Sequence, residues 1–383
     1  MRVLALAPLT LLVWVLVAEA GVVEAHGQRE RRDFRALSDD QVNAIAALDP
    51  PEWDSVDSGH LAKLLVPRVS GTDGNVAVQK YISSVFTKLG WHEDKYATRM
   101  ETPQGELPFT NLVYTFDPDA PRKIVLSAHF DSKWFEQGDF IGATDSAAPC
   151  ATLMDVAEAL TPLLQARKAR MDAGTPILTA HLDEVEAAET TLQLVFFDGE
   201  EAFHEWTDTD SVYGSRYLAE LWEDTYLPDH HALARRRMSP TPNVLDTIDV
   251  LVLLDLLGAP NPKIQSYYRE TDWLFEEMRS ADRRLRAAGL VDTTDAQWFR
   301  EFRGWAGMID DDHRPFLHRG VPVLHVIPNP FPHVWHNFKD DASALDLPTL
   351  RRWNRIMRVF TAGYLGLATD DGASADQVTR DEL

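Results

Sequence analysis

The stretch LQLVFFDGEE, residues 192–201, combines the two features that decide the fold, an apolar run and carboxylates directly after it. The run Leu192–Phe197 is short and shows little alternation of polar and apolar side chains. Such a run is typical of a strand that is buried on both faces of a largely parallel sheet. Asp198, Glu200 and Glu201 then follow at the carboxyl end of the expected strand.

Three further runs repeat this pattern of a short apolar strand. They are Ile124–Ala128, Val250–Leu254 and Val323–Ile327. Helical stretches lie between and after the runs, at Ala151–Leu164, Trp273–Ala288 and Leu350–Leu365. This alternation predicts a single α/β domain with a doubly wound, mostly parallel central β-sheet that is flanked by α-helices.

The start of the chain has the pattern of a signal peptide, which we place at residues 1–20. A nearly unbroken apolar run, Val3–Val17, follows Arg2, and a small-x-small pattern ends at Ala20. Cleavage after Ala25 is a second option, and an uncleaved membrane anchor is the alternative. With about fifteen apolar residues the run is short for a membrane span, which favours cleavage.

Three further segments complete the predicted organisation. We expect a linker over residues 21–33, one ordered domain over 34–366 and a flexible tail over 367–383. The tail ends in Arg-Asp-Glu-Leu, which differs from the Lys-Asp-Glu-Leu retrieval signal by one basic-for-basic change. Together with the signal peptide it predicts location in the lumen of the endoplasmic reticulum, with secretion as the alternative.

Composition narrows the classes of function. Of 383 residues 45% are hydrophobic and 25% charged, as in an ordinary globular protein. Lys and Arg number 37 against 60 Asp and Glu, so the net charge is 37 − 60 = −23, which disfavours nucleic acids and anionic membranes as partners. The only cysteine, Cys150, excludes an intrachain disulfide and a multi-cysteine zinc site. We expect a monomer.

Polar residues follow the other apolar runs as well. His129 and Asp131 come after the first run, Asp255 after the third, and His336 after the fourth. In open α/β sheets the ligand crevice lies outside the carboxyl ends of the strands. The four runs therefore predict one site that is rich in His, Asp and Glu.

Imidazole and carboxylate groups without thiolates are the ligands of a catalytic zinc or another divalent metal. Of the adjacent pair, one of Glu200 and Glu201 could bind the metal while the other handles protons. Asp145, in the small-residue segment Gly142–Ala151, is either a helix N-cap or a further ligand, and its neighbours favour the ligand. A glycosidase-type carboxylate pair would leave the histidines unexplained.

Seven segments resemble the glutaminyl-peptide cyclotransferases, which share the fold of zinc aminopeptidases. They occur in family order and span roughly residues 55–365. The segments are His129–Lys133, Gly142–Ala147, Phe196–Phe203, Tyr213–Arg216, Leu253–Pro262, Asp311–His313 and Arg319–His325, the last continuing through Pro330–Pro332 to Val334–His336.

The resemblance implies a role for each matching residue. It places one zinc ion per chain on Asp145, Glu201 and His336, and the general acid and base on Glu200. Supporting aspartates and pocket aromatics complete the implied site: Asp255, Asp311, Trp206, Phe331 and Trp335. The implied reaction converts the N-terminal glutamine of a peptide or protein, or possibly glutamate, into pyroglutamate and releases ammonia.

The sequence departs from the family at two places. Ala128 stands where animal members often carry a cysteine that can pair with the position of Cys150, so that disulfide is absent. Asp310 adds a third carboxylate beside Asp311 and Asp312. Since crowded like charges raise carboxyl pKa values, we expect Asp310 to alter the proton network.

Two other functions use the same residues. In a zinc aminopeptidase the candidate ligands would hold two metals, with Glu200 activating a water molecule; these ligands are His129, Asp145, Glu201, Asp255 and His336. The cyclase pattern at Trp206, Asp311 and Trp335 disfavours this function. A non-catalytic binding protein on the same scaffold would be expected to lack a ligand or Glu200, and neither is missing.

Overall fold

The computed structural model describes residues 37–48, 56–173, 187, 189–236, 241–291, 297–300 and 308–367. The expected signal peptide and linker lie outside these residues, and so does the expected tail apart from Leu367. The chain divides into two units, Met1–Asp33 and Phe34–Leu383, and all of the described residues belong to the second.

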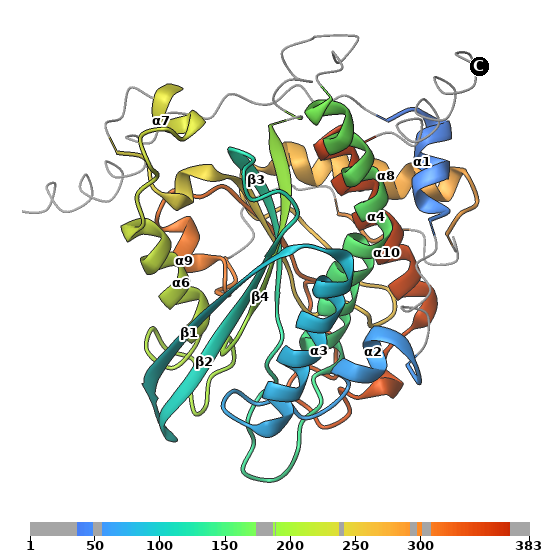
Figure 1. Ribbon diagram of the computed structural model, residues 1–383. Coiled ribbons are helices and arrows are strands. Elements are labelled where there is room, and N and C mark those ends of the chain that lie inside the picture. Colours follow the sequence, from blue (N-terminus) through green and yellow to red (C-terminus); the bar gives the residue numbers. More distant parts are fainter. Residues whose placement is uncertain are drawn as a thin grey trace, which may run out of the picture. The chain divides into compact units, whose positions relative to one another are not determined.

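A six-stranded sheet lies at the centre of this unit (Figure 1). Its strands are β1 (His92–Thr102), β2 (Gly105–Thr115), β3 (Arg122–His129), β4 (Thr190–Phe197), β5 (Ile248–Leu254) and β6 (Val323–Val326). In space their order is β1-β2-β4-β3-β5-β6. β3 pairs in parallel with β4 and β5, and β5 with β6, so the four predicted runs form a parallel sheet and the predicted fold class is confirmed.

The sequence analysis missed the antiparallel hairpin of β1 and β2, which joins the sheet through β4. From Glu93 onward, residues of β1 alternate between exposed and half-buried positions. An edge strand of this kind needs no continuous apolar run, and the charged sequence His92–Lys95 hides the pattern.

Helices cover both faces of the sheet (Figure 1). They are α1 (Asp39–Ala46), α2 (Gly59–Leu64), α3 (Asp73–Leu89), α4 (Ala148–Asp172), α6 (Tyr213–Asp224), α7 (Ala232–Arg236), α8 (Asp272–Ala287), α9 (Arg314–Leu317) and α10 (Leu347–Leu365). Short turns of other helix types are η1 (Ala143–Ala147), η2 (Val244–Thr247) and η3 (Ala342–Ala344). The helical stretches predicted at Ala151–Leu164 and Leu350–Leu365 are parts of α4 and α10, and Trp273–Ala288 matches α8 except for Ala288, the residue after the helix.

Strand β4 shows why the apolar runs lack alternation. Leu194 and Phe196 pack into the core that α3, α4 and α10 cover, whereas Val195 and Phe197 pack into a second core on the opposite face. Trp222 of α6 belongs to this second core. Both faces are buried, so every residue of the strand can be apolar.

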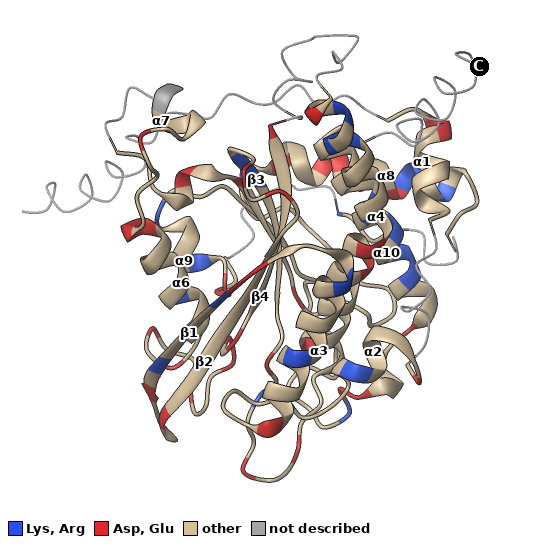
Figure 2. Ribbon diagram, in the orientation of Figure 1, with Lys and Arg blue, Asp and Glu red and all other residues tan. Residues whose placement is uncertain are grey.

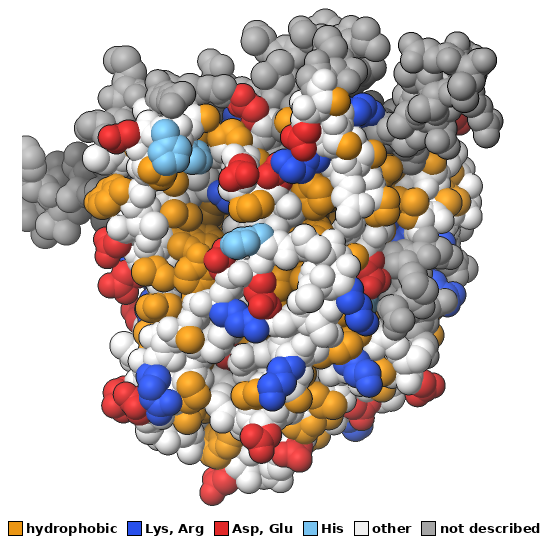
Figure 3. Space-filling model, in the orientation of Figure 1, with side chains coloured by type: hydrophobic (Ala, Val, Ile, Leu, Met, Phe, Trp, Pro, Cys, Tyr) orange, Lys and Arg blue, Asp and Glu red, His pale blue; other side chains and the backbone are white. Residues whose placement is uncertain are grey.

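Charged residues are spread over the described part of the chain. Lys and Arg occur on separate elements, among them α3, α4 and α10 (Figure 2). On the face shown in Figure 3 their side chains lie singly among hydrophobic and acidic ones. Among the described helices none is long and apolar enough to cross a membrane.

Candidate active site

The carboxyl ends of the parallel strands carry the predicted polar residues. His129 is the last residue of β3, Glu200 and Glu201 follow β4 after a short turn, and Asp255 follows β5 directly. All four side chains are buried. Because β4, β3 and β5 are neighbours in the sheet, their ends meet at one edge, as the crevice rule predicts.

Asp145 reaches the same edge from the turn before α4. Gly142 has a φ of +60°, and a Cβ atom at this position would lie 2.1 Å from the carbonyl oxygen of Asp145, so only glycine fits the turn. α4 begins at Ala148 with Ala147 as its N-cap residue. Asp145 is therefore not the cap of this helix, and its carboxylate is available to the site.

A buried carboxylate orients the turn that carries the two glutamates. The backbone N–H groups of Glu200 and Glu201 donate to Oδ1 and Oδ2 of Asp131, each over 3.2 Å. Gly199 has a φ of +77°, and a Cβ atom there would lie 2.4 Å from the ring of Phe109. The sequence analysis placed Asp131 at a strand end but missed this positioning role.

Asp145, Glu201 and His336 come together as one cluster. Nε2 of His336 lies 3.4 Å from Oε2 of Glu201 and 3.7 Å from Oδ2 of Asp145. One ligand atom from each residue lies within 4.8 Å of the others, which suits a single metal ion. Nζ of Lys133 lies 3.2 Å from Oε2 of Glu201 and donates to the carbonyl oxygen of Ala202.

The polar atoms of this cluster fit a bound cation. Oε1 of Glu201 is buried and has no hydrogen-bond partner among the described residues. Burial, and then the charge of Glu201, raises the pKa of Asp145 to about 7. Burial would also raise the pKa of Glu201, but the charges of Lys133 and His336 lower it to about 2. Two carboxylates and an imidazole are a donor set for a divalent metal, which would relieve their repulsion.

Glu200 has a different environment from its neighbour. Burial raises its pKa well above the usual value, and although the charge of His129 opposes this, the charges of Glu201, Asp311 and Asp312 add to the rise. A buried carboxyl group with a raised pKa can accept a proton near neutral pH and give it back. The adjacent glutamates therefore differ in chemistry because their neighbours differ.

Asp311 is buried, and its charge contributes to the raised pKa of Glu200, while Asp255 is buried with its Oδ1 3.4 Å from Nε2 of His129. The hydroxyl of Ser146 donates to Oδ1 of Asp255. Nε2 of His325 lies 2.8 Å from Oδ2 of Asp311, and burial and the charge of Asp255 raise the pKa of Asp311. The sequence analysis gave no role to Ser146 or His325.

Comparison with known proteins identifies the family. The pattern of Peptidase family M28 matches residues 111–361. The glutaminyl-peptide cyclotransferase-like protein of Bos taurus is 40% identical over 330 residues, which are 84% of this chain and 78% of the bovine protein. The glutaminyl-peptide cyclotransferase of Drosophila melanogaster is 37% identical over 80% of each chain. The chain belongs to the glutaminyl-peptide cyclotransferases of family M28.

A solved structure of a family member agrees with this fold. The crystal structure of Macrostomum lignano glutaminyl cyclase matches with a TM-score of 0.72 and 36% identity, over 88% of this chain and 96% of that one. The family resemblance predicted from the sequence is thus confirmed. The comparisons do not favour the aminopeptidase alternative.

The cyclotransferase resemblance also implied three pocket aromatics. Trp335 stacks on the ring of His336 with 4.0 Å between ring centroids, and Phe331 packs edge-on against Trp335 at 4.9 Å. Trp335 is 43% exposed and Trp206, on the loop after Glu201, is 36% exposed. Large aromatic side chains this accessible are available to a ligand.

The additional carboxylate Asp310 pairs with a cation. Its Oδ2 lies 3.1 Å from Nη1 of Arg314, and the same nitrogen lies 2.9 Å from Oδ1 of Asp208. Asp310 is exposed, unlike its buried neighbours Asp311 and Asp312. Arg314 therefore joins the loop that carries Trp206 to the segment that carries Asp311.

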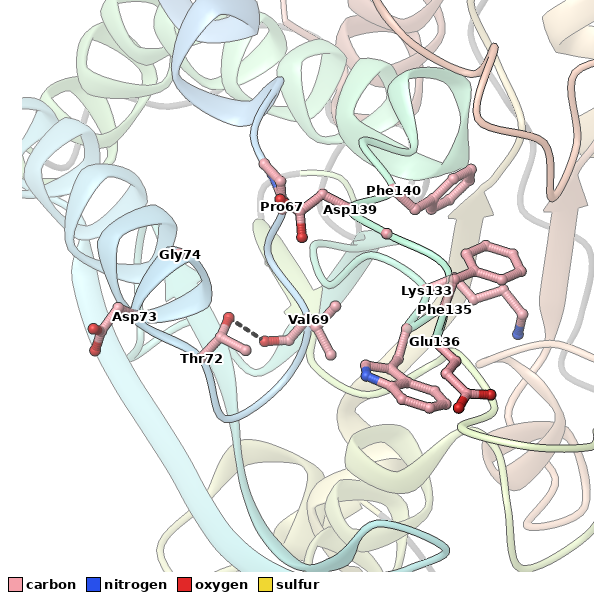
Figure 4. A pocket seen from close by; sticks show the side chains of 12 residues that line it. Pro67, Val69, Thr72, Asp73, Gly74, Lys133, Phe135, Glu136, Asp139 and Phe140 are labelled. Carbon is pink, nitrogen blue, oxygen red and sulfur yellow. Dashed lines mark hydrogen bonds between the residues drawn. The ribbon is translucent and has the colours of Figure 1, made fainter.

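A cavity of about 540 Å³ lies behind the loop Lys133–Phe140 (Figure 4). The N-terminal end of α3, with Thr72 and Asp73, forms its opposite wall. The ammonium group of Lys133 points away from Thr72, and the metal cluster is not part of the lining. The cavity and the metal cluster thus have Lys133 in common, which lines the one and contacts Glu201 of the other.

Proposed function

We propose that this chain converts the N-terminal glutamine of peptides or proteins into pyroglutamate and releases ammonia. The observation that carries the proposal is the placement of Glu200, with its raised pKa, beside the cluster of Asp145, Glu201 and His336. Membership of the cyclotransferase family supports the same reaction.

We propose that the three clustered residues hold one zinc ion per chain. A bound zinc ion polarises a carbonyl group as a Lewis acid and stabilises the negative charge that develops on its oxygen. The donor set suits this role because it consists of three protein ligands, which leaves a coordination position for substrate. Lys133, next to Glu201, holds that carboxylate in its ionised form.

Glu200 handles the protons of the proposed reaction. The α-amine nitrogen of glutamine forms a bond to the amide carbon of its own side chain, and the bond from this carbon to the amide nitrogen breaks. Glu200 takes a proton from the attacking amine and returns one to the departing nitrogen, which leaves as ammonia. No water or second substrate is needed, since the nucleophile belongs to the substrate.

The remaining residues position the reacting groups. Asp255 and Asp311, the aspartates that the family resemblance assigns to the support of Glu200, are themselves held by Ser146 and His325. Trp206, Phe331 and Trp335 would enclose the folded-back glutamine side chain. Cyclisation mainly requires that the amine and the amide carbon are held together, and rigid aromatic walls serve this purpose.

Mass spectrometry of a short peptide that begins with glutamine tests the proposed function. Incubation with the purified protein should remove one ammonia and leave the peptide otherwise intact, and a zinc chelator should stop the reaction. Release of the free N-terminal residue would instead indicate an aminopeptidase. No change in the peptide, with zinc bound to the protein, would support a binding protein.

A further inference from the structure

Arg68 is a fully buried cation that lies in the segment between α2 and α3. In the described residues no carboxylate forms an ion pair with its guanidinium group. Backbone carbonyl groups surround it instead. Burying a charge costs folding free energy unless the charged group is fully hydrogen-bonded. The many acceptors around this guanidinium group therefore indicate that it has a specific structural role.

Four of the acceptors belong to the two segments that carry the site, and the other two, the carbonyl oxygens of Leu64 and Val66, belong to the end of α2 and the residues after it. Nε of Arg68 donates to the carbonyl oxygen of Phe130, the residue after His129, over 2.6 Å. Nη2 donates to the carbonyl oxygens of Gly142, over 2.9 Å, and of the metal ligand Asp145, over 3.4 Å. Nη1 donates to the carbonyl oxygen of Ile141.

The main chain of Arg68 is anchored to the same region. Its N–H group donates to Oγ of Ser132 over 3.0 Å, and its carbonyl oxygen accepts from the side chain of Asn75 in α3 over 3.1 Å. Its neighbours Pro67 and Val69 line the cavity beside the loop Lys133–Phe140 (Figure 4). The backbone of Arg68 is therefore held in place, and so is the position from which its guanidinium group extends.

Asp340 binds the same turn through the backbone N–H groups of the turn, whereas Arg68 binds its carbonyl groups. Its carboxylate accepts the N–H group of Thr144 over 2.8 Å, and its carbonyl oxygen accepts that of Ala143 over 3.0 Å. Asp340 is buried and lies four residues after His336. It thus connects the turn of one metal ligand to the segment of another.

We propose that Arg68 and Asp340 form a buried clamp that already fixes the backbone of Asp145 in its metal-binding position in the metal-free protein. Arg68 holds the carbonyl groups of the turn and Asp340 holds its N–H groups. Both are positioning residues, since they act through the main chain of the ligand. The inference rests on the metal site proposed above.

The zinc affinity of the metal-free protein tests the clamp without any activity measurement. Zinc binding is followed by competition with a chromogenic chelator, and folding by circular dichroism. Arg68→Met should raise the Kd for zinc roughly 10- to 100-fold, the usual effect of removing a residue that orients a ligand. Arg68→Lys restores only part of the cage and should give an intermediate Kd.

Arg358 provides a matched control because it is also fully buried but pairs with Asp155 of α4, away from the metal ligands. Arg358→Met should lower the melting temperature and leave the Kd for zinc within about twofold of the wild-type value. An equal rise in Kd in Arg358→Met would overturn the proposal, because general destabilisation would then explain both. So would an unchanged Kd in a folded Arg68→Met protein.

Asp340 tests the second half of the clamp, and it serves if Arg68→Met fails to fold. Asp340→Ala removes the acceptor for Thr144 and should raise the Kd for zinc roughly tenfold. Asp340→Asn keeps an oxygen that can accept this hydrogen bond and should recover most of the affinity. Equal Kd values for Asp340→Ala and wild type would contradict the clamp. Absence of zinc binding by the wild-type protein would instead contradict the metal site itself.

Discussion

Nε2 of His129 lies 3.0 Å from Oδ1 of Asp145, the carboxylate that also belongs to the cluster with Glu201 and His336. With Asp255, these two residues form a second cluster of potential ligands within 4.8 Å. Two clusters that share an aspartate are what a two-metal site would need. The number of bound metals therefore separates a cyclotransferase with one zinc from the aminopeptidase alternative.

We predict one zinc ion per chain. Burial alone would lower the pKa of His129, but the charges of Glu200 and of its hydrogen-bonded carboxylates raise it well above the usual value. Its ring nitrogens already contact three carboxylates, at 3.4 Å from Asp131, 3.0 Å from Asp145 and 3.4 Å from Asp255, so we expect His129 to hold these side chains and not a second ion. Metal analysis and native mass spectrometry of the zinc-saturated protein should give one ion, and two tightly bound ions would refute the prediction.

Glu200→Gln should abolish most of the cyclisation while zinc remains bound. The amide keeps the size of the side chain but cannot take a proton, and loss of a positioned general base lowers the rate about 10²- to 10⁴-fold. Glu205→Gln, on the exposed loop beyond the site, is the matched control and should retain the wild-type rate. A Glu200→Gln protein with a rate within tenfold of wild type would show that Glu200 is not the base.

The dependence of kcat/KM on pH should show the raised pKa of Glu200. A carboxyl group with a raised pKa keeps its proton up to higher pH, so the base is lost as the pH falls through that value. We expect a change of slope on the acid side of the profile, above the usual glutamate pKa of about 4.3. A slope that stays constant down to pH 4 would contradict this environment.

The sequence predicted those strands in which consecutive side chains are buried on both faces of the sheet. Residues of β4 are apolar on both faces because two cores enclose them, and the carboxylates after them mark the edge of the sheet. β1 gave no such signal because it has no buried residue, and the buried half of β2 has only Leu112–Tyr114 as consecutive apolar residues, between Asn111 and Thr115. Apolar composition predicts a strand only where several consecutive residues are buried and apolar, and neither strand of the hairpin has a long run of this kind.

The site was predictable only in part for a related reason. Asp145, Glu201 and His336 stand in recognisable motifs, and the structure brings them together. Asp131 and His325 act through partners far away in the sequence, and His325 lies inside an apolar run where it reads as a strand residue. Such roles depend on tertiary contacts, which no local pattern contains.

Cys150 should be inert to thiol reagents in the folded protein. Its side chain is fully buried, its Sγ donates to the carbonyl oxygen of His129 over 3.1 Å, and burial raises the pKa of the thiol to about 12. Only the thiolate reacts, so both access and ionisation are lacking. A colorimetric thiol reagent should label the protein only in denaturant. An exposed cysteine from Ser343→Cys should react at once, and rapid labelling of Cys150 itself would contradict the buried position.

The ion pairs of Arg314 should affect substrate binding more than chemistry. Arg314 joins Asp208, two residues after Trp206, to Asp310, next to Asp311. Arg314→Met frees this loop and should raise KM about two- to fivefold with little change in kcat, because exposed ion pairs contribute only about 0–1 kcal/mol. The difference from wild type should shrink at high salt, since exposed charges are screened.

Arg99 is the control for this prediction, because its pair with Glu106 is also exposed to solvent but lies on the hairpin of β1 and β2. Arg99→Met should leave KM unchanged at every salt concentration. A rise in KM for Arg314→Met that persists at high salt would mean that the side chain acts by packing and not by charge. Equal KM values for all three proteins would show that Trp206 is positioned without the bridge.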